Sequence, residues 1–97
     1  MAILIQPDGT RTPLAPADGQ CFTLAELQAA VGGYIELLRL ADGGLVVHEE
    51  GRLVGLPPNP TATRLVYGST FVPGFEIVGP ALQLSAAELA AAENADE

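Results

Sequence analysis

The sequence predicts a single α+β domain with a small, mainly antiparallel sheet and short helices packed on it. A chain of 97 residues, 48% hydrophobic and 16% charged, has enough apolar side chains for one small core. Two aliphatic runs flank Asp42-Gly43-Gly44 and predict a β-hairpin over residues 34–49. A capping-box pattern from Thr23 to Glu26 predicts a short helix. Together these patterns indicate a compact domain of mixed class.

The first residues of the chain predict a hairpin at an edge of the sheet. An apolar run at 2–5 is followed by the turn signal Gln6-Pro7-Asp8-Gly9. Residues 10–14 then return as the second arm. Pro13 places this arm at an edge, because proline lacks the amide donor that an inner strand needs.

A short amphipathic helix is expected over residues 23–31. Thr23 is the N-cap, Glu26 completes the capping box, and Gly32-Gly33 supplies a left-handed stop. A helix this short is stable only when it packs on the sheet. The apolar residues that share its inner face are Leu24, Leu27, Ala30 and Val31.

The central stretch predicts a three-stranded meander. Residues 34–40 are apolar on both alternating faces, which suits an inner strand, and residues 45–49 form the second arm. After a turn at Glu50-Gly51, residues 52–56 are expected to add a third strand that Pro57-Pro58 stops.

A second helix and a last strand are expected after this meander. Asn59 as N-cap and Pro60 at the first helical position predict a short helix that Gly68-Ser69 ends. Residues 76–84 predict a strand interrupted at Gly79-Pro80. The residues expected to form much of the core are Leu27, Val31, Ile35, Leu37, Val47, Leu56, Leu65, Ile77 and Leu82.

The C-terminal residues predict an acidic, alanine-rich tail. A second capping box, from Ser85 to Glu88, precedes this stretch. We therefore expect one α+β domain at 1–84 and a helical or frayed tail at 85–97.

The charge and the cysteine content exclude several kinds of partner and site. The chain has no lysine, and its four arginines stand against twelve acids, for a net charge of −8. That charge disfavours nucleic-acid phosphates and anionic membrane surfaces. Cys21 is the only cysteine, so no intrachain disulfide and no cysteine metal site are expected, and no residue set predicts a cofactor. With neither a signal sequence nor a membrane segment, a cytoplasmic location is expected.

His48-Glu49-Glu50 is the first candidate for chemistry. His48 and Glu50 point to the same side of a strand and Glu49 to the other. A metal ion needs a third ligand, which the neighbouring sequence does not supply. A solvated turn is therefore the favoured interpretation, and a hydrolase using His48 and Glu50 is the weaker alternative. No catalytic or metal residue is assigned.

The start of the helix after Asn59 is the better candidate, as a site for a small anionic ligand. Helix N-termini present unpaired amides and the positive end of the dipole, which favour phosphate or carboxylate. Thr61 and Thr63 add hydroxyls, and Arg64 adds a cation. Tyr34 and Arg52 are expected nearby if the meander forms, and would suit a nucleotide. The alternatives are that Asn59 only caps the helix while Thr63 is a surface residue, and that Tyr34 is a half-buried strand residue. Phe71 and Phe75 either line a partner surface or close the core.

Four short motifs resemble the DUF3846 family of small, uncharacterised phage and mobile-element proteins, over roughly residues 24–84. They are VGGYIE at 31–36, EEG at 49–51, GLPPNPTAT at 55–63 and IVG at 77–79. His48 departs from the polar residue, such as Asn, that the resemblance leads us to expect. The resemblance implies a small α+β fold, a setting in bacteriophages or conjugative elements, and a role as an accessory module that blunts host defences, with no established reaction.

Two functions are expected from these observations. The first is a non-catalytic binder that sequesters a small anionic ligand, with a nucleotide immune signal as the candidate. The second is a protein-interaction module that inhibits a host defence protein directly, including an acidic DNA-mimic mode. A homo-oligomer is also expected, because 48% hydrophobic residues exceed what one small core readily hides.

Overall fold

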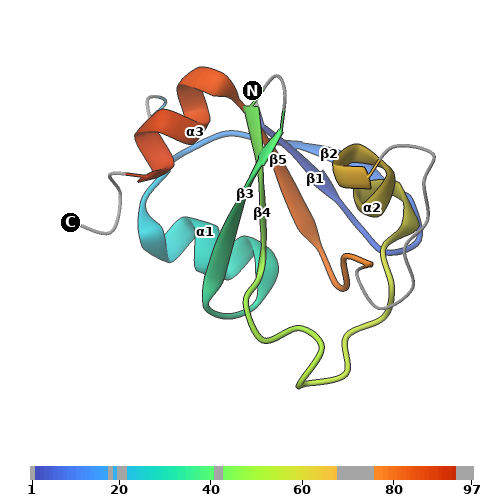
Figure 1. Ribbon diagram of the computed structural model, residues 1–97. Helices are drawn as coiled ribbons and strands as arrows, with labels where there is room; N and C mark the ends of the chain where they lie inside the picture. Colours follow the sequence, from blue (N-terminus) through green and yellow to red (C-terminus); the bar gives the residue numbers. More distant parts are fainter. Residues whose placement is uncertain (1, 18, 20–21, 41–42, 68–75, 94–97) are drawn as a thin grey trace.

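A computed structural model of the chain describes residues 2–17, 19, 22–40, 43–67 and 76–93, and it shows the expected α+β class (Figure 1). Its strands form one antiparallel sheet, and short helices pack on both faces. The elements are β1 (Ala2–Ile5), β2 (Arg11–Leu14), α1 (Leu24–Val31), β3 (Ile35–Leu40), β4 (Gly43–His48), α2 (Pro60–Tyr67), β5 (Ala81–Ser85) and α3 (Ala86–Glu93).

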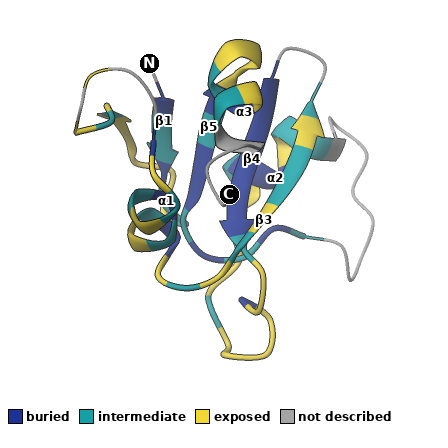
Figure 2. Cartoon of the chain, turned by 90° about the vertical axis from the view of Figure 1, so that its left-hand side faces the viewer, coloured by how far each residue is buried: buried dark blue, intermediate teal, exposed yellow. Residues whose placement is uncertain are grey.

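The strand order is β2-β1-β5-β4-β3, which places β5 between the two hairpins. Helices α1 and α3 cover one face of the sheet, and α2 covers the other (Figures 1 and 2). The inner strand β4 has helices on both sides, and its residues Gly43 to Val47 are all buried. The sheet is therefore the middle layer of three.

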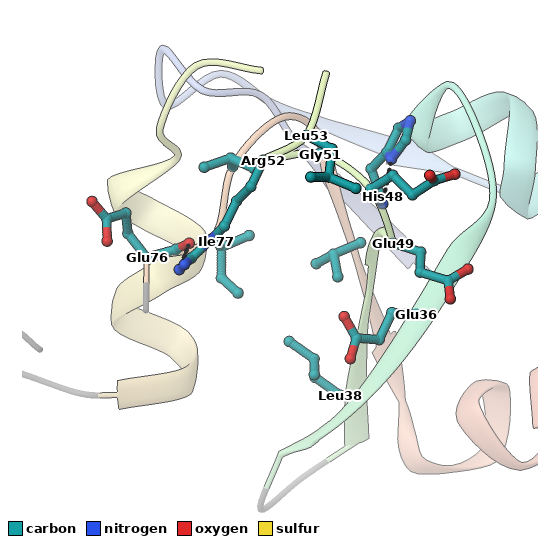
Figure 3. A pocket seen from close by; sticks show the side chains of 12 residues that line it. Glu36, Leu38, His48, Glu49, Gly51, Arg52, Leu53, Glu76 and Ile77 are labelled. Atoms are coloured by element: carbon teal, nitrogen blue, oxygen red, sulfur yellow. Dashed lines mark hydrogen bonds between the residues drawn. The ribbon is translucent and has the colours of Figure 1, made fainter. Parts of the chain in front are cut away.

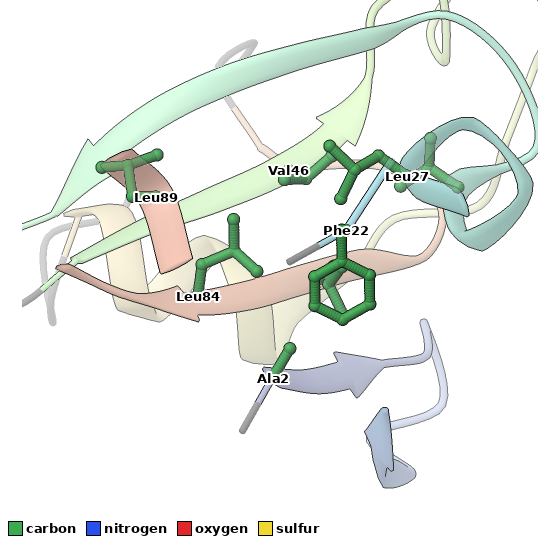
Figure 4. Packing of buried hydrophobic residues seen from close by; sticks show 8 residues of the cluster. Ala2, Phe22, Leu27, Val46, Leu84 and Leu89 are labelled. Atoms are coloured by element: carbon green, nitrogen blue, oxygen red, sulfur yellow. The ribbon is translucent and has the colours of Figure 1, made fainter. Parts of the chain in front are cut away.

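The core is divided between the two faces of the sheet because strand side chains alternate. Val46 points toward α1 and α3, whereas Leu45 and Val47 point toward α2. The first cluster comprises Ala2, Phe22, Leu27, Val31, Val46, Leu82, Leu84 and Leu89 (Figure 4). The second comprises Leu45, Val47, Ala62, Ile77 and Ala81.

Most of the expected core residues lie in or against these clusters. Those buried as predicted are Leu27, Val31, Val47, Ile77 and Leu82. Ile35, Leu37 and Leu65 are half-buried and pack against the clusters from the sheet edge or from α2. Leu56 is also half-buried.

The N-terminal hairpin forms as predicted. β1 pairs with β2 in a register that sets Ile3 opposite Pro13, and Pro13 lies on the outermost strand. The Thr10 amide donates to Asp8 Oδ1 at 2.9 Å in the connecting turn, and this bond lowers the pKa of the Asp8 carboxyl. Gly9 takes the left-handed φ of 92° that ends the turn.

Both capping boxes are confirmed. Thr23 Oγ1 accepts from the Glu26 amide at 3.2 Å, and Glu26 Oε1 accepts from the Thr23 amide at 2.8 Å. The Ser85 and Glu88 pair repeats this exchange at the start of α3. α3 is part of the packed fold, because its Leu89 side chain is buried over β4 and β5.

The predicted third strand at 52–56 is wrong. The chain turns from Gly51 to Gly55, and residues 52–55 are exposed. Gly55 has a φ of 75°, which no strand residue adopts, and the Leu56 amide donates back to the Gly51 carbonyl at 2.9 Å. β5 takes the place beside β4 instead, because its aliphatic residues can be buried there. β3 is consequently an outer strand, and the prediction that residues 34–40 form an inner strand is also wrong.

Several predicted features lie outside the described residues: the turn at Asp42, the helix end at Gly68-Ser69, Phe71 and Phe75, Cys21 and the last four residues. Among the residues that are described, no helix is long and apolar enough to cross a membrane.

Candidate functional site

An open cleft of about 270 Å³ lies between the β3–β4 hairpin and the segment that precedes β5 (Figure 3). Its apolar lining comes from Leu38, Val47 and Ile77. Glu36 extends from β3 into the cleft, and Arg52 reaches down from the opposite wall. The cleft thus has an apolar interior with charged groups at its opening.

The charges around this cleft are mainly negative. Glu36, Glu49, Glu50 and Glu76 all contribute to its lining, together with a single arginine, Arg52. The Arg52 guanidinium donates to the Glu76 carbonyl at 3.1 Å. Part of its hydrogen-bonding capacity is therefore used within the wall of the cleft. An acidic opening of this kind favours a cation over an anion.

His48 has a structural role at one end of the cleft. Its Nδ1 accepts from the Glu50 amide at 3.0 Å, which closes the turn after β4. An Asn side chain makes the same bond to the amide two residues later, so His48 can substitute for the expected Asn without changing the turn. The imidazole also packs so closely over Gly33 that a Cβ at residue 33 would collide with it.

The expectation of a solvated turn at 48–50 agrees with this geometry. Glu49 and Glu50 are exposed. No group of three His, Cys, Asp or Glu side chains that could hold a metal ion is present in the described part of the chain.

Three large apolar side chains are exposed on the segments at this end of the sheet, and we call Tyr34, Leu53 and Val54 the apolar rim. They are 65%, 83% and 61% exposed, respectively. Leu53 also lines the cleft. The Tyr34 carbonyl accepts from the Glu49 amide at 2.8 Å, so Tyr34 lies at the same end of the sheet. The interpretation of Tyr34 as a half-buried residue is therefore wrong.

Asn59, by contrast, is completely buried and joins three parts of the fold. Its Nδ2 donates to the carbonyls of Ile5 at 3.0 Å and Gly79 at 2.9 Å. Its Oδ1 accepts from the Ala62 amide at 3.1 Å, which confirms the predicted N-cap of α2. All the hydrogen-bonding atoms of this side chain are thus used within the protein.

Thr63 is used internally in the same way. Its hydroxyl donates to the Asn59 carbonyl at 2.8 Å and accepts from the Ile77 amide at 2.9 Å. Thr61 is half-buried, and Arg64 is exposed on α2. Of the predicted ligand-binding residues around α2, only these last two present side chains toward solvent.

The structure brings some of the predicted residues together and separates others. Arg52 contacts Glu76, whose neighbour Ile77 bonds both Asn59 and Thr63, so Arg52 lies near α2 as expected. Tyr34 is on the opposite side of the cleft, with Glu49.

Glu36, Leu53 and Val54 are among the cleft and rim residues that sequence reasoning missed. Their signal is weak, because Glu36 appears on the polar face of a strand, and Leu53 and Val54 were assigned to a strand that does not form.

The match to a known family extends over nearly the whole chain. Residues 1–91 match DUF3846, which is described as a domain of unknown function. The chain belongs to the DUF3846 family. The DUF3846 match confirms the resemblance seen at 24–84 and extends it to β1, β2 and most of α3.

The structure also explains one DUF3846-like motif, GLPPNPTAT at 55–63. Gly55 turns the chain, Asn59 ties α2 to two other segments, and Thr63 fastens the helix to Ile77. No curated protein and no solved structure matches the chain.

Proposed function

We propose that this chain is a non-catalytic protein-interaction module that binds its partner through the acidic cleft and the apolar rim. The observation that carries the proposal is the presence of both features at one end of the sheet. Lysine and arginine side chains combine an apolar stem with a cationic head. Leu38, Val47 and Ile77 suit the stem, and Glu36 suits the head.

Apolar burial provides most of the affinity in this proposal. Burying an exposed leucine or valine stabilises a complex by about 1.5–3 kcal/mol, whereas an exposed ion pair contributes about 0–1 kcal/mol. Leu53 and Val54 are therefore the anchoring residues. The acids around the cleft select a basic partner and raise its association rate, since the whole chain carries a charge of −8.

A non-catalytic role is consistent with how the polar residues are used. His48 Nδ1 closes a turn, and Asn59 and Thr63 hold α2 in place. None of these groups is held ready to activate water. The proposed binding therefore requires neither a catalytic step nor a rearrangement of the fold.

The biological setting that we propose rests on what the resemblance described above implies. A phage or mobile element would use the module in the host cytoplasm to inhibit a defence protein. Binding of a basic surface by the acidic cleft includes the DNA-mimic mode, in which the module occupies a site meant for nucleic acid.

The second candidate function is sequestration of a small anionic ligand, such as a nucleotide immune signal. Arg52 on the cleft wall and the exposed ring of Tyr34 favour it. Against it, the acids of the cleft oppose an anion, and Asn59 and Thr63 are already bonded. The predicted set of Tyr34, Arg52, Asn59, Thr61, Thr63 and Arg64 remains a prediction.

Affinity capture from host lysate, with matched variants, tests the interaction proposal. We expect a stoichiometric protein partner that is lost with the double variant Leu53→Ser/Val54→Ser, because both anchors become polar. Glu36→Gln should weaken binding roughly five-fold and reduce its dependence on salt.

Glu93→Gln is the control for the capture experiment, because it removes one negative charge from α3 on the opposite face of the sheet. It should bind like the wild type. Capture that is unchanged by the Leu53 and Val54 substitutions would contradict the assignment of this surface.

A further inference from the structure

We propose that His48 is a positioning residue for Leu53 and Val54 of the apolar rim, and that gain of a proton by its ring releases them and weakens binding at the cleft. The inference rests on the function proposed above and names a residue that regulates the same site. His48 is the last residue of β4 and the only histidine in the chain. Histidine is the side chain whose charge changes most readily between about pH 5 and 8.

The hydrogen bond that His48 makes is the first of two that lead to the rim. Its Nδ1 accepts from the Glu50 amide at 3.0 Å. The carbonyl of Glu50 in turn accepts from the Val54 amide at 3.1 Å. Glu50 is therefore held by His48 on one side and holds Val54 on the other.

Hydrogen bonds, and not a core, hold the segment that carries these rim residues. Residues 52–55 are all exposed. The segment is closed by the Gly51 amide, which donates to the His48 carbonyl at 3.2 Å, and by the Leu56 amide, which donates to the Gly51 carbonyl at 2.9 Å. A segment with so little buried side-chain surface changes conformation easily when one of its hydrogen bonds is lost.

Only the neutral ring of His48 can make the bond to Glu50. In the neutral form Nδ1 accepts and the proton lies on Nε2, whereas in the charged form both ring nitrogens are donors. A protonated Nδ1 would face the Glu50 amide, which is also a donor. Protonation of His48 therefore breaks the first of the two bonds.

The charged groups around His48 act in the same direction. Gly33 and Ile35, which the ring and the strand of His48 meet on the side of β3, carry no charge. An imidazolium is attracted by carboxylates and repelled by an amide donor, so the charged ring turns away from the Glu50 amide. The charged residues that line the cleft together with His48 are Glu36, Glu49, Glu50, Arg52 and Glu76 (Figure 3).

An NMR titration of the free, labelled protein from about pH 8 to about pH 5 tests the positioning role without any partner. The amides of Glu50 and Val54 should shift together with the ring resonances of His48. In His48→Asn these two amides should not follow that transition, because an Asn side chain makes the same bond to the amide two residues later and has no titrating ring. Every carboxylate is the same in the two proteins.

Binding of the blocked peptide acetyl-Leu-Arg-Leu-amide tests the consequence for the cleft. Its arginine stays charged throughout this pH range, so the peptide itself does not titrate. The wild type should bind it roughly five-fold more weakly at about pH 5.5 than at about pH 7.5, since one hydrogen bond of the turn is lost. His48→Asn should bind equally at the two pH values.

Gly33→Ala displaces the ring without changing His48. The backbone of Gly33 is not left-handed, so alanine fits there, but its Cβ would collide with the imidazole. At about pH 7.5 this variant should bind as weakly as the wild type does in acid. The matched control is Gly33→Ala/His48→Asn, which should bind like His48→Asn because no ring remains to be displaced.

Glu50 and Val54 amides that ignore the titration of the ring, or that shift equally in His48→Asn, would overturn the inference. Equal peptide affinity of the wild type at the two pH values would also overturn it. Absence of peptide binding at any pH would instead contradict the function proposed above. The titration of the free protein would then still decide whether His48 positions the rim.

Discussion

Asn59 joins three separate segments of the fold through its side chain. Its amide group holds the end of β1 and the segment before β5, and its oxygen caps α2. Asn59→Ala would remove the side-chain hydrogen bonds to the Ile5 and Gly79 carbonyls and the cap of α2. We expect it to lower the free energy of unfolding by about 3 kcal/mol or more. Urea denaturation followed by circular dichroism measures this change.

The control for this prediction is Thr61→Ala, two residues after Asn59 in the first turn of α2. Thr61 is only half-buried, so the loss should be below about 1 kcal/mol. Equal effects of the two substitutions would contradict the role given to Asn59.

Sequence reasoning at the residue scale succeeds where the partner is close in the chain. Asn59 capping α2 and Thr23 exchanging bonds with Glu26 both follow from spacing alone. The hydrogen bonds from Asn59 to Ile5 and Gly79 span 54 and 20 residues, and no local sequence pattern predicts them. For this reason the residue was predicted as part of a ligand site and is found buried.

At the scale of elements, the turn at 48–56 shows why the strand order was only partly predictable. Residues 52–56 have the composition of a strand. Residues 45–47 of β4 need a second strand beside them, and either segment could have supplied it. The choice between that segment and β5 depends on which one can bury its side chains against both helical layers. β5 buries Ala81, Leu82 and Leu84, whereas Gly55 at a φ of 75° prevents the nearer segment from extending. Local propensity was overridden by tertiary packing.

The same packing predicts where the fold is most protected. Amides of β4 and β5 should exchange most slowly, because β4 is buried between two helical layers and both strands have neighbours on both sides. Amides of β2 and of the turn at 52–55 should exchange fastest, since residues 11–13 and 52–55 are exposed. Hydrogen exchange followed by NMR gives the order. Slower exchange in β2 than in β4 would contradict this account of the core.

At the scale of the whole molecule, the two outer strands of the sheet differ in chemistry. β2 contains Pro13, which has no amide to donate, whereas β3 contains no proline. The acidic cleft and the apolar rim lie at one end of the sheet. The expected class, the caps and most of the core were predictable from sequence. The cleft was not, because Glu36, Arg52 and Ile77 meet only when the hairpin folds beside the segment before β5.

In the function proposed above, this cleft and its rim recognise a basic side chain with apolar neighbours. The most direct measurement is an NMR titration of the labelled protein with the blocked peptide acetyl-Leu-Arg-Leu-amide at millimolar concentrations. We expect saturable shifts confined to the amides of Glu36, residues 48–54 and Ile77, and weaker binding for Glu36→Gln. Shifts that do not saturate, or a parallel titration with ADP-ribose that saturates at residues 60–64, would contradict it.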